Sequence, residues 1–353
     1  MRLLPPEWET TRLLRVATKA IQLRVFINSC RHKGTRICQE DEGTKPAFTC
    51  PYHGWTYDLS GCLRGLLEKP VHTGGLNKED WALIEAPRVE SYRGLIFANF
   101  DRASVSLDEY LGELKWYLDI LFAQPANGFS TFGGVHRWRV KANWKLPAEQ
   151  FSGDVSHATG VHQSIGRLGF DMKYGDSDKD FMFRTPNGHV WTNLADRNRM
   201  LLSEYESKLQ AEARSRLSPE QQALMGCLYV CNIFPNFALV SYPGLITIRV
   251  WQPHGPAESE IWSWGLVPTD ALRTTRNVPV AHSHIRFLLQ EYSNRMMLKF
   301  GRKYRKEWPV PSERNSPCRI RLDGMKASKI LSQQEFDLRF RPKTPRLVSI
   351  WRG

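Results

Sequence analysis

The sequence predicts an α+β protein with two domains, each built on antiparallel strands. The chain has 353 residues, 41% of them hydrophobic, and a single core stops growing at roughly 250 to 300 residues. Short segments rich in β-branched and aromatic residues, separated by turn residues, occupy residues 24–100. Two longer segments with alternating apolar residues, 247–253 and 259–268, flank a His-Gly-Pro-Ala turn. This pattern predicts a β-hairpin in a second antiparallel sheet.

The first predicted domain spans residues 1–105. Its strand-like segments are RVFINSC (24–30), AFTCPYHGWTYD (47–58) and RGLIFANF (93–100). A turn is expected at Asp58–Gly61, which has the composition Asp-Leu-Ser-Gly. No Pro- and Ser-rich linker follows Phe100. The second domain is therefore expected to pack directly against the first.

Two short motifs in this domain each combine one cysteine with one histidine: Cys30-Arg31-His32 and Cys50-Pro51-Tyr52-His53, with Gly34 and Gly54 just after them. A Cys2His2 zinc site uses the same donors but prefers its cysteines close together and its histidines close together. The order Cys-His, Cys-His resembles a Rieske 2Fe-2S centre, where two thiolates hold one iron and two imidazoles hold the other. We therefore predict Cys30, His32, Cys50 and His53 as the cluster ligands.

Other residues near the two motifs are expected to support the cluster or the core around it. Glycines beside the ligands let the backbone approach the cluster closely, and Trp55 and Tyr57 are expected to shield it from solvent. Cys38 and Cys62 are expected to fill the local core as free thiols. The seven cysteines are too scattered for a disulfide scaffold, which predicts a reducing compartment.

A second candidate metal site follows the strand-like segment 133–146. Residues 147–164 suit a helical segment that carries Asp154, His157 and His162. The two histidines lie about 140° apart on an ideal helix, so both reach one metal if the helix bends. Two histidines plus a carboxylate make the facial triad of non-haem Fe(II) oxygenases. Taken alone, this histidine pair is also compatible with a purely structural role.

Five phrases together carry a family resemblance: CRHKG, CPYHGWTYD, YRGLIFANF, NWKLPAEQF and GDVSHATGVH. The chain resembles, over roughly residues 24–269, the large (alpha) subunit of the Rieske non-haem iron aromatic ring-hydroxylating dioxygenases. The resemblance implies a helix-grip-like catalytic domain over residues 106–270, an antiparallel sheet with helices. It also implies that His157 and His162 bind the mononuclear Fe(II), and that Asp154 bridges this iron to the Rieske cluster of a neighbouring subunit.

The resemblance further implies the reaction and its participants. Dioxygen is added to an aromatic ring to give a cis-dihydrodiol, with electrons that come from NADH or NADPH through a reductase and a ferredoxin. The enzyme is expected to be a cytoplasmic homotrimer, or a hexamer with a small beta subunit, that binds neither nucleic acid nor membrane. Apolar residues are expected to form the substrate walls, such as Phe151, Val155, Phe170 and Leu245. Three alternatives stay open: a Rieske monooxygenase or demethylase, an electron-transfer protein, and an inactive relic of the enzyme.

The positive charge of the chain is concentrated at one end. The net charge is +13, yet residues 270–353 alone hold 19 Lys and Arg against 7 Asp and Glu, a net of +12. A basic tail is one way to bind nucleic acid, but no aromatic interleaving or known binding motif accompanies it. Residues 271–353 are therefore predicted to be an anomalous tail, outside both domains.

A reading-frame error would explain this tail. Met296 and Met297 must be encoded by ATGATG, and the frame one base earlier reads GAT, an Asp codon. Permissible codons for residues 292–302 then spell Phe-Glu-Gln-Asp-Asp-Ala-Glu-Ile-Trp-Glu, which resembles the carboxylate helix of the family. In the frame as written, the third iron ligand is not identifiable. The alternative is a genuine basic helical tail in which Asp323 or Asp337 is the carboxylate ligand.

Overall fold

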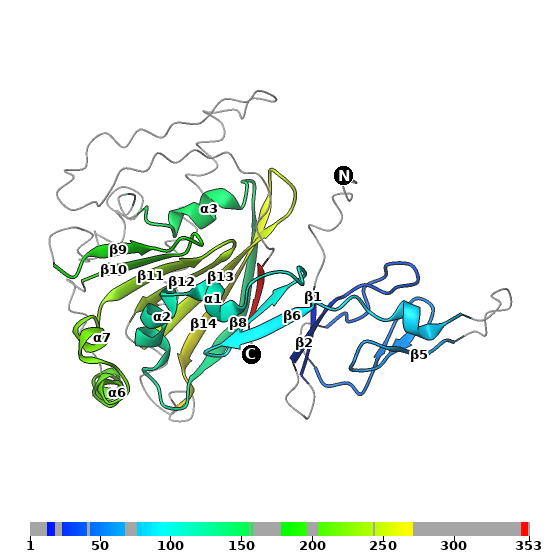
Figure 1. The fold of residues 1–353 in the computed structure, drawn as a ribbon, viewed down its shortest axis with the longest axis horizontal. Coiled ribbons are helices and arrows are strands. Elements are labelled where there is room, and N and C mark those ends of the chain that lie inside the picture. Colours follow the sequence, from blue (N-terminus) through cyan, green and yellow to red (C-terminus); the bar gives the residue numbers. More distant parts are fainter. Residues whose placement is uncertain are drawn as a thin grey trace, which may run out of the picture.

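The computed structural model describes residues 13–17, 23–40, 43–67, 76–154, 157, 178–195, 204–242, 244–270 and 347–351. A large antiparallel sheet with helices forms the main body, and a smaller domain of short strands lies beside it (Figure 1). The predicted α+β class is confirmed. No helix among the described residues is long and apolar enough to cross a membrane.

Seven antiparallel strands form the large sheet, in the order β8-β14-β13-β12-β11-β10-β9. Their bounds are β8 (Phe129–Val140), β9 (Phe181–Arg184), β10 (Val190–Leu194), β11 (Leu228–Ile233), β12 (Phe237–Tyr242), β13 (Leu245–Pro253) and β14 (Ser259–Pro268). The predicted hairpin is confirmed, because β13 and β14 pair from Ile246↔Leu266 to Pro253↔Ser259. The His254 amide closes its turn by donating to the Glu258 carbonyl at 2.9 Å.

The strand predicted over residues 133–146 ends earlier than expected. β8 stops at Val140, and α3 (Lys145–Gln150) begins within the last two residues of the predicted segment. The Asn143 side chain accepts a hydrogen bond from the Lys145 amide at 3.1 Å, which satisfies one of the free amides that open a helix. Pro147 lies in the first turn, where its missing N–H removes no helical hydrogen bond.

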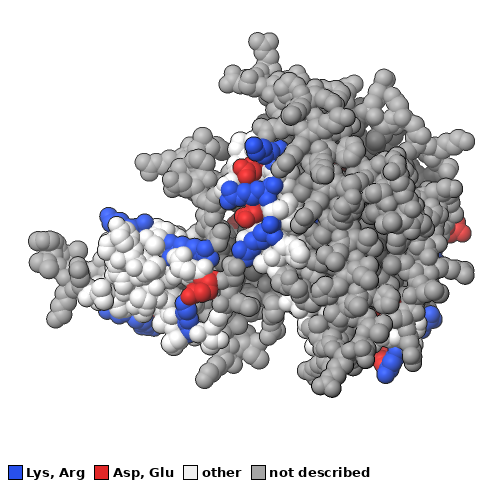
Figure 2. All heavy atoms as spheres, turned by 180° about the vertical axis from the view of Figure 1, so that it is seen from behind, with Lys and Arg blue, Asp and Glu red and all other residues white. Residues whose placement is uncertain are grey.

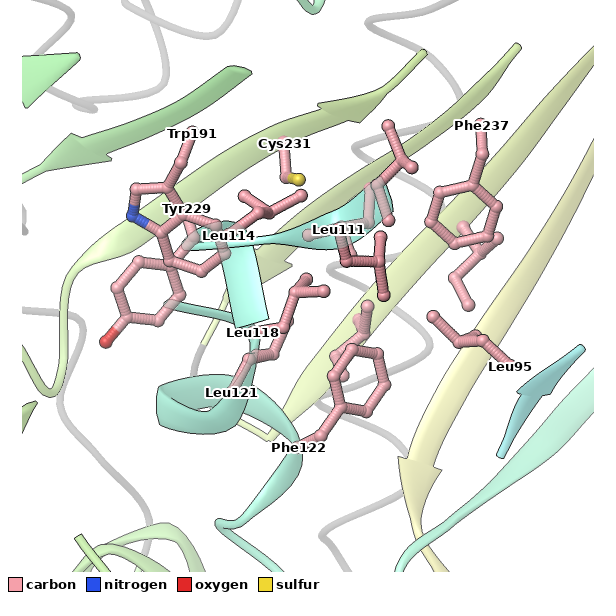
Figure 3. Packing of buried hydrophobic residues seen from close by; sticks show 14 of the residues in the cluster. Leu95, Leu111, Leu114, Leu118, Leu121, Phe122, Trp191, Tyr229, Cys231 and Phe237 are labelled. Carbon is pink, nitrogen blue, oxygen red and sulfur yellow. The ribbon is translucent and has the colours of Figure 1, made fainter. Parts of the chain in front are cut away.

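One face of the sheet is covered by α1 (Leu107–Leu111) and α2 (Leu114–Phe122). Ser106 caps α1, because its hydroxyl accepts the Glu109 amide at 3.1 Å. Figure 3 shows leucines of both helices pointing at aromatic residues of the strands. The largest core of the protein lies here, and Leu111, Leu114 and Leu118 within it are fully buried. Two further helices follow β10, α6 (Glu204–Arg214) and α7 (Pro219–Ala223).

The opposite face of the sheet packs against α3. This smaller core contains Ala148 and Phe151 from α3 and its C-terminal end, together with Val240 and Trp251 from the strands. Side chains alternate between the two faces along each strand. On β12, for example, Leu239 belongs to the core of the first face. The sheet therefore separates α1 and α2 from the segment that carries the second candidate metal site.

The smaller domain is built from short strands around its own core. Its elements are β1 (Leu13–Ala17), β2 (Leu23–Ile27), β3 (Phe48–Thr49), β4 (Thr56–Tyr57), β5 (Leu63–Gly65) and the 3-10 helix η2 (Lys78–Trp81). The predicted turn at Asp58–Gly61 is confirmed, since the Gly61 amide donates to the Asp58 carbonyl at 3.0 Å. Both motif cysteines belong to this core.

A three-stranded sheet of β15 (Leu347–Trp351), β7 (Leu95–Asn99) and β6 (Arg88–Tyr92) joins the two bodies. Every residue of β7 is buried. Leu95 and Phe97 belong to the large core under α1 and α2, whereas Ala98 packs with Val25 of β2. The expectation that the two domains pack directly against each other is thus confirmed.

Of the predicted basic tail, only residues 347–351 are described, and they pair antiparallel with β7. Residues 271–346, with Asp323 and Asp337, lie outside the described residues. On the described surface seen in Figure 2, basic and acidic side chains alternate along a strip between the smaller domain and the main body. Arg139 of β8 and Glu258 beside β14 form an ion pair at 4.0 Å.

Candidate functional site

The two Cys/His motifs form loops of the same shape, which we call cluster loop 1 (residues 30–35) and cluster loop 2 (residues 50–55). In each loop the cysteine amide donates to the carbonyl five residues later, and the cysteine carbonyl accepts from the glycine amide four residues later. These distances are 2.8 and 2.9 Å in cluster loop 1, and 2.8 and 3.0 Å in cluster loop 2. The equal spacing from cysteine to glycine therefore produces two matching loops, each with one thiol and one imidazole.

Glycine is required where each loop turns back. Gly34 has φ +76° and Gly54 has φ +68°, in the left-handed region that side chains disfavour. A Cβ on Gly54 would also lie 2.8 Å from the Leu67 Cβ, which no ordinary contact allows. The glycines after the motifs thus serve loop geometry, and the expected close approach of the backbone to the cluster stays a prediction.

The two thiols lie inside the small domain. Cys30 is 4% exposed and Cys50 is 3% exposed. Burial raises the pKa of the Cys50 thiol, and the neighbouring Cys30 raises it further. Without a cation the Cys50 thiol therefore resists ionisation, whereas bound iron favours thiolates. The Tyr57 hydroxyl lies 3.4 Å from the Cys30 sulfur and accepts the Arg31 amide at 3.1 Å. Burial and then the Cys30 contact raise the pKa of Tyr57, so the phenol keeps its proton.

The two imidazoles lie together at the loop tips. The ring centroids of His32 and His53 are 4.7 Å apart. His32 is half-buried, and its Nδ1 is buried without a hydrogen-bond partner, although a buried polar atom normally has one. His53 is exposed. An orphaned imidazole nitrogen beside a second imidazole and two buried thiols fits a cluster held by two donors of each kind.

No group of three or more His, Cys, Asp or Glu in the described part of the chain surrounds a single point where one metal ion could bind. A two-iron cluster does not need such a group, because each iron takes two protein ligands. The arrangement of the two loops therefore differs from a four-ligand zinc site, in which all donors meet at one ion.

Polar side chains at the base of the loops hold them in place. The buried Asn28 accepts the Ile37 and Cys38 amides and donates to the Cys38 carbonyl at 2.8 Å. Asp58 accepts the Ser60 and Cys62 amides. Burial acts to raise the pKa of Asp58, but these hydrogen bonds and others keep it below its usual value. The expectation of free thiols at Cys38 and Cys62 is confirmed, and both are half-buried.

The second candidate site begins at the end of α3. The Asp154 carboxylate lies 3.3 Å from Nδ1 of His157, and the Asp154 carbonyl contacts the same nitrogen. With acceptors on both sides, Nδ1 is the nitrogen that carries the proton, so Nε2 is the nitrogen that would bind a metal. His162 lies outside the described residues, as do Val155 and Phe170. The structure thus brings together two of the three residues predicted for this site.

Side chains of the large sheet contact the C-terminal end of α3. Asn232 of β11 donates to the Ala148 carbonyl at 3.1 Å and also to the Ser152 hydroxyl. The Phe151 ring packs on Trp251 at 5.4 Å, and the buried Arg249 guanidinium lies 5.1 Å from the Phe151 ring centroid. Of the expected substrate walls, Phe151 and Leu245 are both buried.

Several residues that shape these sites were not predicted. Trp81 packs on Trp55 with ring centroids 5.3 Å apart, and Asn232 approaches α3 from 84 residues away. Glu149 lies near Asp154, and burial followed by the Asp154 charge raises the pKa of Glu149. Trp81 and Asn232 have no local sequence signal, because their contacts join segments that the motifs do not include; Glu149 lies within the NWKLPAEQF phrase but was given no role.

Two protein-family models match the chain, one for each body of the structure. The Rieske [2Fe-2S] domain matches residues 9–73. The ring hydroxylating alpha subunit (catalytic domain) matches residues 107–296, more than half of the chain and past Asp270. Together with the two loops and the sheet, these matches define a Rieske protein with a second, catalytic domain. The chain belongs to the family of ring-hydroxylating alpha subunits.

Curated relatives agree with this assignment. The biphenyl 2,3-dioxygenase subunit alpha of Rhodococcus jostii is 37% identical over 272 residues, which cover 72% of this chain and 58% of the relative. The benzene 1,2-dioxygenase subunit alpha of Pseudomonas putida is also 37% identical, with 72% and 60% covered. The N,N-dimethyl phenylurea N-demethylase subunit alpha of a Sphingobium species is 32% identical, with 69% and 58% covered. The chain thus spans about three fifths of the length of these relatives.

Solved structures show the same fold. Naphthalene 1,2-dioxygenase from a Rhodococcus species, bound to indole, aligns with a TM-score of 0.65 and 32% identity over 74% of this chain and 63% of that chain. A second naphthalene 1,2-dioxygenase with indole in its active site gives a TM-score of 0.72 at 25% identity, over 84% and 70%. A quaternary ammonium Rieske monooxygenase, at 16% identity and a TM-score of 0.63 over 85% and 72%, shares the fold.

Proposed function

We propose that this chain is the large subunit of a terminal oxygenase that adds both atoms of dioxygen to adjacent carbons of an aromatic ring, giving a cis-dihydrodiol. The pair of matching Cys/His loops, with two buried thiols and an orphaned imidazole nitrogen, carries the proposal. Family membership links these loops to a catalytic domain. The names of the biphenyl, benzene and naphthalene relatives support an aromatic hydrocarbon as substrate.

In the proposed reaction, the smaller domain would hold the electron-donating cluster, and the domain with the large sheet would hold the iron that reacts with dioxygen. Cys30 and Cys50 would bind one iron of the cluster, and His32 and His53 the other. When bound, the cluster supplies single electrons and the mononuclear iron activates dioxygen. The buried thiol side of the loops excludes water, and the exposed His53 ring faces outward, where an electron partner can approach.

Asp154, His157 and His162 would serve the mononuclear iron. Asp154 holds the proton on Nδ1 of His157, so that Nε2 points its lone pair at the metal. The same carboxylate would bridge His157 to a cluster histidine of a neighbouring subunit. Asn232, Phe151 and Arg249 fix the turn that carries Asp154. The protein would thus exclude water and position the iron ligands. The Asp154 carboxylate would also lie on the path of the electrons between the two metal sites.

Iron content and spectroscopy test this proposal together. The purified chain should contain a Rieske cluster with its visible absorption and, after reduction, its characteristic electron paramagnetic resonance (EPR) signal. A working enzyme should hold three irons per chain, and a surrogate ferredoxin and reductase with NADH should support oxidation within a panel of benzene, biphenyl, naphthalene and benzoate analogues. A chain that binds zinc in place of the cluster would contradict the proposal, and two irons per chain would favour an electron-transfer protein or an inactive relic.

Demethylation or monooxygenation is the second candidate, because one relative is named an N-demethylase subunit and the metal ligands are shared. Product analysis distinguishes the two reactions. A cis-dihydrodiol carries both oxygen atoms of one dioxygen molecule, whereas a demethylase releases formaldehyde and incorporates one. Labelling with 18O2 therefore decides between them on the same enzyme preparation.

The third iron ligand and the partners complete the proposal. We retain the reading-frame hypothesis for residues 271–353, and sequencing of the gene tests it: an intact frame with no nearby Asp-Asp codon pair would refute it. If the frame is shifted, the chain as written binds the mononuclear iron weakly. We also propose a cytoplasmic homotrimer, or a hexamer with a beta subunit, that receives electrons from a ferredoxin or reductase. Size-exclusion chromatography with light scattering measures the assembly.

A further inference from the structure

The two histidines of the cluster loops have different aromatic neighbours. Trp55 lies parallel to His32, with ring centroids 4.9 Å apart and an interplanar angle of 4°. Tyr52 lies beside His53 at 3.8 Å, but it is tilted by 33° and 64% exposed. Trp55 is itself half-buried, and its indole packs on the small-domain core. One imidazole is therefore stacked against a fixed indole, and the other is open to solvent.

Trp55 is held from two directions. Its carbonyl accepts the Cys50 amide at 2.8 Å, which ties its backbone to cluster loop 2. The edge of Trp81 meets its ring at 5.3 Å and 76°. Trp81 ends η2, which is anchored by the Lys78 ammonium donating to the Arg64 carbonyl at 2.8 Å. The indole thus reaches from cluster loop 2 to the histidine of cluster loop 1 and has little freedom to move.

We propose that Trp55 is a positioning residue that fixes the orientation of His32 and lowers the reduction potential of the cluster by excluding water from that imidazole. The inference rests on the proposed cluster. Reduction adds one negative charge, and water stabilises the more highly charged state, so solvent at the ligands raises the potential. A stacked indole removes that solvent from His32. Tyr52 does not do so for His53, which is already exposed.

The test compares variants of the full chain with the cluster in place. Trp55→Leu should shift the midpoint potential to more positive values and alter the EPR spectrum of the reduced cluster, because the imidazole is both hydrated and free to rotate. Trp55→Phe keeps a stacking ring and should restore most of the wild-type potential. Tyr52→Leu is the matched control: it removes a ring from the other imidazole and should shift the potential much less.

Trp81→Leu gives a second measurement in case Trp55→Leu does not hold its cluster. It removes the edge contact on Trp55 without touching His32, and should shift the potential in the same direction by a smaller amount. An unchanged potential in Trp55→Leu, or in Trp81→Leu if the former loses its cluster, would overturn the inference. An equal shift in Tyr52→Leu would overturn it as well. A wild-type chain without a Rieske spectrum would refute the proposed function itself, so the two failures are distinguishable.

Discussion

At the residue scale, the Tyr57 hydroxyl connects the protein backbone to the sulfur of Cys30, a proposed cluster ligand. The Tyr57 oxygen already accepts the Arg31 amide, so its own proton is left for the Cys30 sulfur 3.4 Å away. A hydrogen bond to a ligand sulfur stabilises the reduced, more negative cluster and raises the potential. The same atom therefore fixes the position of cluster loop 1 and tunes its chemistry.

Tyr57→Phe is accordingly expected to lower the midpoint potential. A net hydrogen bond of about 1 kcal/mol corresponds to roughly 40 mV for a one-electron couple. Spectroelectrochemical titration measures the shift. Tyr92→Phe is the control, because the Tyr92 hydroxyl bonds Asp119 and Lys115 in α2, away from the cluster loops. A potential that is unchanged in Tyr57→Phe would mean that the phenol proton does not point at the sulfur.

Gly54→Ala should weaken cluster loop 2. A side chain in the left-handed region costs about 1 to 2 kcal/mol, and here the new Cβ also meets the Leu67 Cβ at 2.8 Å. We expect reduced cluster occupancy, read from visible absorption per chain, and a lower thermal midpoint. Gly94→Ala is the matched control, since Gly94 has φ +85° but nothing within 4 Å of its added Cβ. Equal cluster occupancy in the two variants would contradict a specific role for Gly54.

The cluster loops were predictable because their chemistry is local. The order of Cys and His in two short motifs predicts Cys30, His32, Cys50 and His53 as donors, and the structure places these residues in two matching loops. Contacts from distant segments could not be predicted in this way. Nothing in the sequence near Trp81 points to Trp55, and nothing near Asn232 points to α3, because such contacts are set by the packing of whole elements.

At the element scale, the buried His189 ties α1 to the strands. Its Nε2 donates to the Tyr110 carbonyl at 2.8 Å, and its Nδ1 accepts the Phe234 amide at 3.1 Å. Only the neutral ring can make both bonds, because protonation would place an N–H against the Phe234 N–H. Burial lowers the pKa of His189, in agreement with this geometry.

This histidine should make stability depend on pH. The unfolded chain takes up a proton near pH 6.5, whereas the folded chain does so only at lower pH. The contribution of His189 is therefore complete above about pH 6.5 and declines as the pH falls below it. Melting temperatures at pH 7.5 and 5.5 measure the effect. His189→Gln should reduce the difference between them, at a cost of about 1 to 3 kcal/mol for an unsatisfied partner.

The control for this prediction is His254→Gln, in the turn between β13 and β14, which leaves the contacts of Tyr110 and Phe234 in place. It removes the same side-chain type from the chain. If His189→Gln and His254→Gln show the same pH dependence as the wild type, the buried imidazole does not contribute to acid destabilisation.

Element boundaries were predictable where turns and alternation agree. The β13–β14 hairpin has both signals, and its turn at His254 lies where expected. The strand predicted through residue 146 failed because the alternation of polar and apolar residues continues past β8 over residues 141–146 into α3, so the pattern alone does not separate the two elements. At the start of α3 the Asn143 side chain accepts the Lys145 amide, a contact that the alternation of residues does not predict.

At the scale of the whole molecule, β7 joins two hydrophobic cores. Phe97 belongs to the core under α1 and α2, while Ala98 next to it packs on Val25 of the smaller domain. A continuous run of buried residues predicts a strand covered on both faces, but not which core each face belongs to. The expected boundary at residue 105 falls after this shared strand.

Phe97→Ala should therefore destabilise both bodies together. Truncating a buried phenylalanine costs about 3 to 5 kcal/mol. Thermal unfolding followed by tryptophan fluorescence and by cluster absorbance should give coincident midpoints in the wild type and in the variant, both lowered in the variant. Val105→Ala, at a residue that is 43% exposed, is the control and should leave both midpoints nearly unchanged. Cluster absorbance that melts at its wild-type temperature in Phe97→Ala would show that the two bodies unfold independently.

The shared strand also bears on how such proteins could be recombined. A chimera that takes its electron-transfer half from one parent and its oxygenase half from another must inherit β7 from one of them. Either choice places one face of the strand against an unfamiliar core. Splicing after Phe100 keeps Ala98 with Val25, so apolar repacking falls on Leu95 and Phe97, and the Tyr92 hydroxyl must find its partners in α2 of the oxygenase parent. These three positions would thus bear on whether the halves of different parents are compatible.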